Sequence, residues 1–344
     1  MQLQELSLDS VKALRCMNMP PPAARPQRPA YPPQPQPDAI VASVIVPSFN
    51  SKLTIRATLQ AILTQKTSYP FEVIVVDSSN DGTAELVGRE FPAVRLFRLH
   101  QQVYPGSGRN LGVQRALGRY VVFTDSDCVP ASDWLERIVA SIRTRDTDAV
   151  GGCVVNGYPK RLTGWVSHLI EFNEWTENTP AGQVKNIPTC NIAYRRQIFF
   201  ERHLSFTDIF PSEDTIFNWI LTERGGRIYF DPGIRVVHFG RVGLRRLLRH
   251  QFTLGQASAE ARRTTTLPGQ LFVRYPILSL LLPGIRWLRT FWRLLKNDRK
   301  QCALFVGITP LYLTAVFAWS VGFMWKRPFG PAAITVESGG ASIN

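Results

Sequence analysis

Two aspartates separated by one residue, in the run Asp125-Ser126-Asp127, directly follow a short apolar segment and are the first candidates for chemistry. Carboxylates on a turn can converge on a hard divalent cation such as Mg²⁺ or Mn²⁺, which prefers oxygen ligands and often shares its shell with phosphates. A metal held there would neutralise a diphosphate as it leaves. The same residues would also suit an ordinary turn or helix cap.

Other polar residues stand at similar places. Asp77 ends a second apolar run and could accept hydrogen bonds from a base or a ribose, or simply close a strand. Glu213 and Asp214 precede a helical run, where one could deprotonate an acceptor hydroxyl, or both could complement the helix dipole. His238 follows an apolar run and could be a third metal ligand or a core histidine.

A glycine-rich segment, Pro105-Gly106-Ser107-Gly108-Arg109-Asn110, reads as a flexible loop that opens a helix. Its main-chain amides and the Arg109 guanidinium suit a phosphate or the edge of a nucleotide. The spacing matches neither a Walker A motif nor a dinucleotide fingerprint. Asp81, just before Gly82-Thr83, is expected to cap the next helix.

Short apolar runs and helical periodicities alternate in the first half of the chain. Strands are expected at 44–47, 71–76, 94–99 and 120–124, with helices at 54–63, from 83 and at 109–118. This order predicts an α/β fold with a doubly wound, mainly parallel sheet and helices on both faces. Ligands of such sheets bind beyond the carboxyl ends of the strands, where Asp77, Asp125 and Asp127 are expected.

Composition changes divide the chain into expected segments. Prolines recur through residues 1–39, which predicts a disordered arm, and residues 40–255 are expected to form one α/β domain with halves 40–130 and 131–255. Residues 256–301 predict basic interfacial or re-entrant helices. Residues 302–325 contain no charge and predict a transmembrane helix, with a second span at 275–285 left open, and residues 326–344 form a tail.

The net charge of +14 calls for an anionic partner. Arginines crowd 241–249 and 286–300, beside the most apolar part of the chain, and no nucleic-acid-binding motif is present. An anionic membrane surface is therefore favoured over nucleic acid. The five scattered cysteines predict buried thiols in a reducing compartment.

In order, these motifs resemble the family 2 glycosyltransferases with the GT-A fold. The matching runs are VIVPSFN (44–50), EVIVVDSSNDGT (72–83), GSGRNLGVQRALGRYVVFTDSDC (106–128), CNIAYRR (190–196), SEDTIF (212–217) and VVHFG (236–240). The resemblance covers about residues 42–255.

The resemblance implies a role for each candidate. The implied donor-binding residues are Pro47, Phe49, Asp77, Arg109, Asp125 and Asn191. Asp214 is the implied catalytic base, with Glu213 beside it on the acceptor side. Asp127 and His238 are the implied ligands of Mg²⁺ or Mn²⁺.

The implied reaction is an inverting transfer from a nucleoside-diphosphate sugar, by default a UDP-sugar. The acceptor is expected to be a lipid-linked or membrane-proximal glycan in polysaccharide or cell-envelope synthesis. The expected location is the cell membrane, with the catalytic domain on the cytoplasmic face. The QxxRW motif of processive synthases is absent, and RRLLRHQF (245–252) stands in its region, so addition of one or a few sugars is expected.

Two alternatives remain at this point. A metal-dependent nucleotidyltransferase would share the alternating elements and the acidic pair, but normally has its glycine-rich loop directly after the first strand. Release of pyrophosphate rather than nucleoside diphosphate would identify it. A non-catalytic membrane scaffold would keep the fold without needing Asp214.

Overall fold

The computed structural model describes residues 40–325, and the expected arm (1–39) and tail (326–344) lie outside the described residues. Within this range, nine strands form one sheet. They are β1 (Ala42–Ser48), β2 (Phe71–Asp77), β3 (Arg95–Arg98), β4 (Tyr120–Phe123), β5 (Cys128–Pro130), β6 (Ala149–Asn156), β7 (Gly182–Val184), β8 (Ile192–Arg195) and β9 (Ile228–His238).

The helices before residue 240 are α2 (Ile55–Leu63), α3 (Thr83–Glu90), α4 (Pro105–Arg115), α5 (Trp134–Thr144), α6 (Leu162–Glu171), α7 (Gln197–Glu201) and α8 (Glu213–Glu223), with the 3₁₀ helix η1 (Thr189–Asn191). The C-terminal helices are α9 (Leu244–Thr264), α10 (Gln270–Arg274), η2 (Pro276–Leu281), α11 (Leu282–Asn297), α12 (Arg299–Gly307) and α13 (Thr309–Met324).

The sheet has the order β3-β2-β1-β4-β8-β6-β9-β5, with β7 also paired to β9. Strands β3, β2, β1 and β4 are parallel. The chain runs outward from β1 to β3 and then returns to the other side of β1 as β4, which creates a topological switch point between β1 and β4. The expected α/β class with a mostly parallel central sheet is confirmed.

The second half of the sheet is mixed. Strand β8 lies antiparallel between β4 and β6, and β9 pairs parallel with β6 and antiparallel with β5. The β5–β9 register sets Cys128 opposite His238. This pairing joins residues 110 positions apart in the chain at the edge of the sheet that β5 forms.

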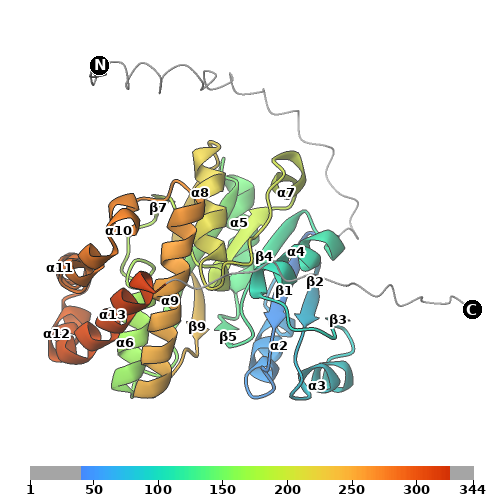
Figure 1. Cartoon of the computed structure of the whole chain (residues 1–344). Helices are drawn as coiled ribbons and strands as arrows, with labels where there is room; N and C mark the ends of the chain where they lie inside the picture. The colour runs from blue at the N-terminus through green and yellow to red at the C-terminus, as the bar shows by residue number, and fades with distance from the viewer. Residues whose placement is uncertain (1–39, 326–344) are drawn as a thin grey trace, which may run out of the picture. The chain divides into compact units, whose positions relative to one another are not determined.

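Both faces of the sheet are covered, which is why β1 is buried along its whole length. Val44 and Val46 pack with apolar residues of α2, α3 and α5, whereas Ile45 packs with those of α4, α7 and α8. In Figure 1 these helices flank the central arrows. A Cβ on Gly112 would collide with the Ile45 side chain, so a glycine there lets α4 lie close against β1.

Two expectations about α4 are wrong. The segment 105–110 is not a flexible loop but the first turn of the helix, because Pro105 stands at the first helical position, where its fixed φ favours helix and its missing N–H costs no hydrogen bond. The helix also ends at Arg115 rather than at 118. Arg109 is consequently held on a regular element.

The expected single helix over 302–325 is also wrong. Helices α12 and α13 meet at Ile308 with a bend of 77°. Pro310 in the first turn of α13 explains the break, because it cannot donate a main-chain hydrogen bond back into α12. Among residues 40–325, no single helix is long and apolar enough to cross a membrane, and only the bent α12–α13 pair meets those limits jointly.

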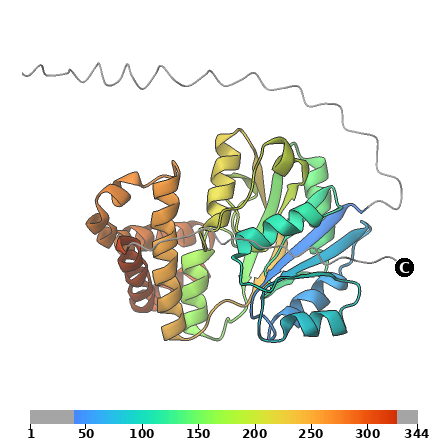
Figure 2. The same ribbon diagram turned by 45° about the vertical axis from the view of Figure 1, so that its right-hand side comes forward.

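Helices α9 and α13 cross in direct contact through two glycines. A Cβ on Gly255 would meet the Trp319 carbonyl, and one on Gly322 would meet the Phe252 carbonyl. Helix α9 itself runs uninterrupted past residue 255. Figures 1 and 2 show α9, α11, α12 and α13 gathered with α6, on the side away from strands β1 to β3.

Candidate active site

A cleft of about 990 Å³ opens at the carboxyl ends of the strands around the switch point. Its walls include Pro47, Phe49, Arg109, Asp125, Asp127, Glu213, Asp214 and His238. Eight of the ten residues expected from the sequence to act on the donor, the acceptor or the metal therefore face one cavity. Asp77 and Asn191 do not line it.

Arg109 links two of the acids. Its guanidinium donates from Nη2 to Asp125 Oδ1 and from Nη1 to Glu213 Oε1, each at 2.7 Å. Arg109 is only 2% exposed, and its ring neighbour is Phe206, at 5.8 Å. Since α4 is rigidly packed on β1, Arg109 fixes the turn after β4 relative to the start of α8.

Glu213 and Asp214 form the first turn of α8, where main-chain N–H groups favour negative charge. Burial raises the pKa of Glu213 to about 7; Arg109 opposes this rise and the nearby Asp214 adds to it. Glu213 Oε2 is buried without a hydrogen-bond partner among the described residues. Glu213 is thus a proton-holding group next to the cleft.

Asp214 is half-buried and held in place by the main chain. Its Oδ1 accepts from Thr215 N at 2.6 Å, and its Oδ2 accepts from Thr189 N at 3.4 Å. Burial raises the pKa of Asp214, although Arg109 opposes this. A fixed carboxylate with a raised pKa is a better proton acceptor than an ordinary surface aspartate.

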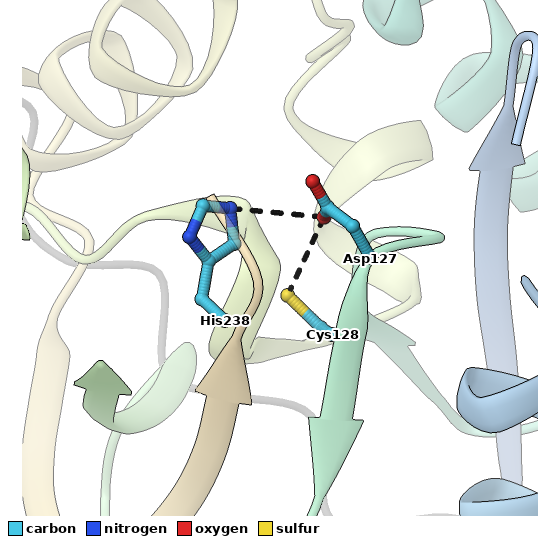
Figure 3. Close-up of side chains that lie close together, drawn as sticks. All are labelled: Asp127, Cys128 and His238. Atoms are coloured by element: carbon cyan, nitrogen blue, oxygen red, sulfur yellow. Dashed lines mark hydrogen bonds and ion pairs between the residues drawn. The ribbon is translucent and has the colours of Figure 1, made fainter. Parts of the chain in front are cut away.

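Asp127, directly before β5, and His238, the last residue of β9, point toward each other, as Figure 3 shows. His238 Nε2 is 3.7 Å from Asp127 Oδ1, and the Cys128 Sγ is 3.9 Å from the same oxygen. These three side chains lie close enough together to hold one metal ion. The β5–β9 pairing is what brings them together.

The donor set fits a hard divalent cation through Asp127 and His238. Burial raises the pKa of Asp127, and His238 opposes that rise without cancelling it, so the carboxylate lacks a full complement of positive charge. Hard cations such as Mg²⁺ and Mn²⁺ prefer oxygen and nitrogen ligands to the sulfur that Cys128 offers. We therefore assign the candidate ligands to Asp127 and His238 and not to Cys128.

Of the residues expected to bind the nucleoside, Pro47 and Phe49 line the cleft and Asp77 does not. Pro47 lies near the end of β1 and Phe49 directly after β1, and Phe49 is 40% exposed. Asp77 is fully buried behind the wall, and its carboxylate accepts from Ser79 Oγ at 2.6 Å. Tyr104 and Phe210, which the sequence did not single out, stack at 6.0 Å and also line this part.

The expectation that Asn191 contacts the donor is wrong. Asn191 is fully buried, and its Oδ1 accepts from Trp134 Nε1 at 2.8 Å. Its Nδ2 donates to the carbonyls of Cys153 and Ile234. With these bonds made, the side chain ties three segments of the core together and does not reach the cleft.

Sequence reasoning also missed a basic extension of the cleft. Arg241, Arg246, His250 and Arg286 line it together with Glu171. The crowding of arginines over 241–249 was the available signal, but it was interpreted as a membrane-facing surface. The C-terminal helices therefore contribute to the cleft itself.

A mostly parallel sheet with acids gathered at its switch point is the arrangement of the GT-A fold. Residues 43–202 match the family model described as glycosyl transferase family 2. The chain therefore belongs to glycosyl transferase family 2 through this segment.

The chain also resembles individual proteins in sequence. The chain is 39% identical over 125 residues to glycosyltransferase AglE of Haloferax volcanii, covering 34% of this chain and 40% of that protein. It is 30% identical over 114 residues to a chondroitin synthase of Escherichia coli, covering 32% of this chain and 17% of that protein. The chain thus aligns with less than half the length of these relatives.

Among solved structures, mannosyltransferase PcManGT from Pyrobaculum calidifontis, in complex with GDP-Man and Mn²⁺, superposes with a TM-score of 0.56. The match covers 92% of this chain and 94% of that one, at 23% identity. At this identity the likeness establishes the shared fold.

Proposed function

We propose that the chain is an inverting glycosyltransferase that moves a sugar from a nucleoside-diphosphate sugar to a hydroxyl of a lipid-linked or membrane-proximal glycan, in cell-envelope or polysaccharide synthesis. The observation that carries the proposal is that Asp127 with His238 and Asp214 with Glu213 face one cleft at the switch point. The GDP-Man and Mn²⁺ in the superposed mannosyltransferase support a nucleotide sugar and a divalent metal.

In this proposal each residue of the cleft has a separate role in the transfer. Asp214 accepts the proton of the acceptor hydroxyl as the new oxygen–C1 bond forms and the bond from C1 to the diphosphate oxygen breaks. Asp127 and His238 would hold Mg²⁺ or Mn²⁺, and the ion would supply charge stabilisation for a departing diphosphate. Arg109 holds Asp125 and Glu213 at fixed positions by bonding both carboxylates.

Pro47, Phe49 and the stacked Tyr104–Phe210 pair offer apolar and aromatic surface for a nucleoside. A base can stack on such rings. UDP is the proposed donor nucleotide. Asp77 is proposed to support donor binding from behind this wall, because it is buried and does not line the cleft.

We further propose that the chain works at the cell membrane, with its catalytic domain on the cytoplasmic face. The support is an exposed apolar surface over α10, η2 and α11, here called the α11 surface. Its members are Leu271, Tyr275, Ile277, Leu280, Leu281, Ile285, Leu288, Trp292 and Leu295, all at least 37% exposed. Exposed apolar patches of this kind, next to basic residues, are typical of membrane-interface helices.

The first test is release of nucleoside diphosphate with Mn²⁺ from UDP-, GDP- and dTDP-sugars, with a membrane extract as the acceptor source. We expect release from one donor, its loss with EDTA, and a fall of about a hundredfold or more for Asp127→Asn and Asp214→Asn. Asp133→Asn is the matched control, because Asp133 is outside the cleft and pairs with Arg137 on α5.

Pyrophosphate release instead would identify a nucleotidyltransferase. Equal turnover by Asp214→Asn and wild type would contradict the assignment of the base.

A further inference from the structure

The cleft continues beyond His238 into a basic end that the transfer chemistry does not use. This end, here called the basic arm, is lined by Arg246 and His250 of α9 and by Arg286 of α11. The apolar side chains of Ile170, Leu254 and Trp319 complete its wall. It is thus formed by the C-terminal helices rather than by the α/β core.

Arg286 has no carboxylate within ion-pair distance among the described residues. Its Nη2 donates to the Ile170 carbonyl at 3.3 Å, and its guanidinium lies 4.9 Å from the centre of the Trp319 ring. Burial lowers the pKa of Arg286, which means that the folded protein leaves this charge short of a partner.

The carboxylate of Glu171, which acts on Arg286, already contacts two other side chains. Glu171 Oε2 lies 3.3 Å from His250 Nε2, and Glu171 Oε1 accepts from Gln251 Nε2 at 3.1 Å. Burial disfavours its ionisation, but His250 and Arg241 outweigh this and lower the pKa of Glu171 to about 2. Glu171 thus orients His250, and its single charge also acts on Arg286, so it leaves part of the positive charge of the basic arm without compensation.

Arg246 adds a second positive charge at the mouth of the basic arm. It is exposed, lines the cleft, and forms no ion pair in the described part of the chain. Two guanidiniums that face one concave space repel each other unless an anion sits between them. Planar guanidiniums bind phosphoryl oxygens in a charge-assisted, often bidentate way.

The surroundings indicate what the anion is attached to. Ile285 and Leu288 flank Arg286 on α11 and belong to the exposed α11 surface. An apolar chain that starts at the basic arm can therefore continue along Leu254 and Trp319 toward this surface. A phosphoryl group with a long apolar tail matches both parts.

We propose that the basic arm binds the phosphoryl group of a prenyl-phosphate-linked glycan, whose sugar hydroxyl is the acceptor, with Arg246 and Arg286 as the ligands of that phosphoryl group. This inference rests on the proposed glycosyl transfer and names the acceptor class for the same cleft. It assigns the donor diphosphate to the Asp125–Asp127 side and the lipid phosphate to the α9–α11 side.

The test measures binding of geranylgeranyl phosphate to the full chain in detergent by calorimetry, with no sugar nucleotide present. Geranylgeraniol, inorganic phosphate and phosphatidylglycerol are the comparison probes. We expect the prenyl phosphate to bind at least about tenfold more tightly than each of them.

Arg246→Gln and Arg286→Gln should each weaken prenyl-phosphate binding about tenfold or more. The matched controls are Arg249→Gln on α9 and Arg289→Gln on α11, exposed residues that do not line the cleft, and they should bind as wild type does. Arg246 is on the surface, so its variant remains informative even if Arg286→Gln fails to fold.

Equal binding of the alcohol, of inorganic phosphate or of phosphatidylglycerol would overturn the proposal, and so would unchanged affinity in Arg246→Gln. Donor turnover is followed in parallel. A wild type that binds the prenyl phosphate but releases no nucleoside diphosphate would contradict the proposed function. An enzyme that releases nucleoside diphosphate but does not bind the prenyl phosphate through Arg246 and Arg286 would contradict only this inference.

Discussion

Arg109 determines how the acids of the cleft behave. One buried guanidinium shared by Asp125 and Glu213 compensates the two carboxylates only in part, so the acids nearest α8 hold their protons more tightly than usual. Breaking such a cluster by removing the cation would leave uncompensated buried charge, which is strongly destabilising. The cluster therefore couples protonation in the cleft to the stability of the fold.

Glu213→Gln should change how stability depends on pH. Glu213 has a pKa of about 7 when folded and about 4.5 when unfolded, so the folded state holds its proton longer as pH rises. Its stabilising contribution is complete below about pH 4.5 and is lost as pH rises through about 7. The variant lacks this loss and should gain stability relative to wild type across that window, by about 1.4 kcal/mol per unit of pKa shift.

The measurement is the free energy of unfolding in urea at pH 4.5, 6 and 7.5 for both proteins. Differences that stay constant over the three pH values would show that Glu213 titrates normally in the folded state.

The sequence identified candidate site residues by their chemical type, but it could not show which residues they contact in the fold. Asp127 and His238 could be named because each follows an apolar run, but their proximity depends on the pairing of β5 with β9. Asn191 was misjudged because its hydrogen-bond partners, Trp134 and two carbonyls, come from three distant segments. No local pattern in the sequence records such contacts.

Single helices and strands were predictable where the hydrophobic periodicity agreed with the positions of the prolines that bound them. The strands β1, β2 and β4 overlap the expected apolar runs, with β1 and β2 longer than expected, because buried parallel strands are continuous in hydrophobicity. The break between α12 and α13 was missed because hydropathy alone treats Thr309-Pro310 as part of a neutral run. Pro105 and Pro310 were both more informative than the residues around them.

Gly322→Ala tests the contact between α9 and α13. The new methyl group would meet the Phe252 carbonyl, so the helices would have to separate, at a cost of about 1–3 kcal/mol. Gly88→Ala on α3 is the control, since its Cβ meets nothing within 4 Å. Gly88 is exposed in a helix, and alanine should stabilise it by about 1 kcal/mol.

Thermal unfolding of the two variants should therefore shift in opposite directions from wild type. An upward shift for both would mean that α9 and α13 do not pack this closely, and that the walls of the basic arm are not fixed by this crossing.

For the whole molecule, the distribution of charge matters more than its total. The net charge of +14 includes arginines that line the cleft as well as those that face outward. A sequence-level sum cannot separate these groups, because only the packing of α9 and α11 against α6 decides which arginines turn inward. The same packing leaves the apolar residues of the α11 surface exposed.

The α11 surface predicts membrane binding that depends on both charge and apolar contact. The full chain should sediment with vesicles that contain phosphatidylglycerol and much less with phosphatidylcholine alone, and added salt should weaken binding because it screens the basic residues. Leu288→Glu combined with Trp292→Glu should reduce binding at least about fivefold, because the two residues are 49% and 59% exposed and would place carboxylates against the lipid.

Leu117→Glu is the matched control, since Leu117 is 65% exposed but lies between α4 and β4, outside the α11 surface. If Leu117→Glu and the double variant lost binding equally, net charge alone would account for attachment. If only the double variant lost it, the surface that holds the lipid would also be the one next to Arg286. The mouth of the basic arm would then open where a lipid-linked acceptor can enter without leaving the membrane.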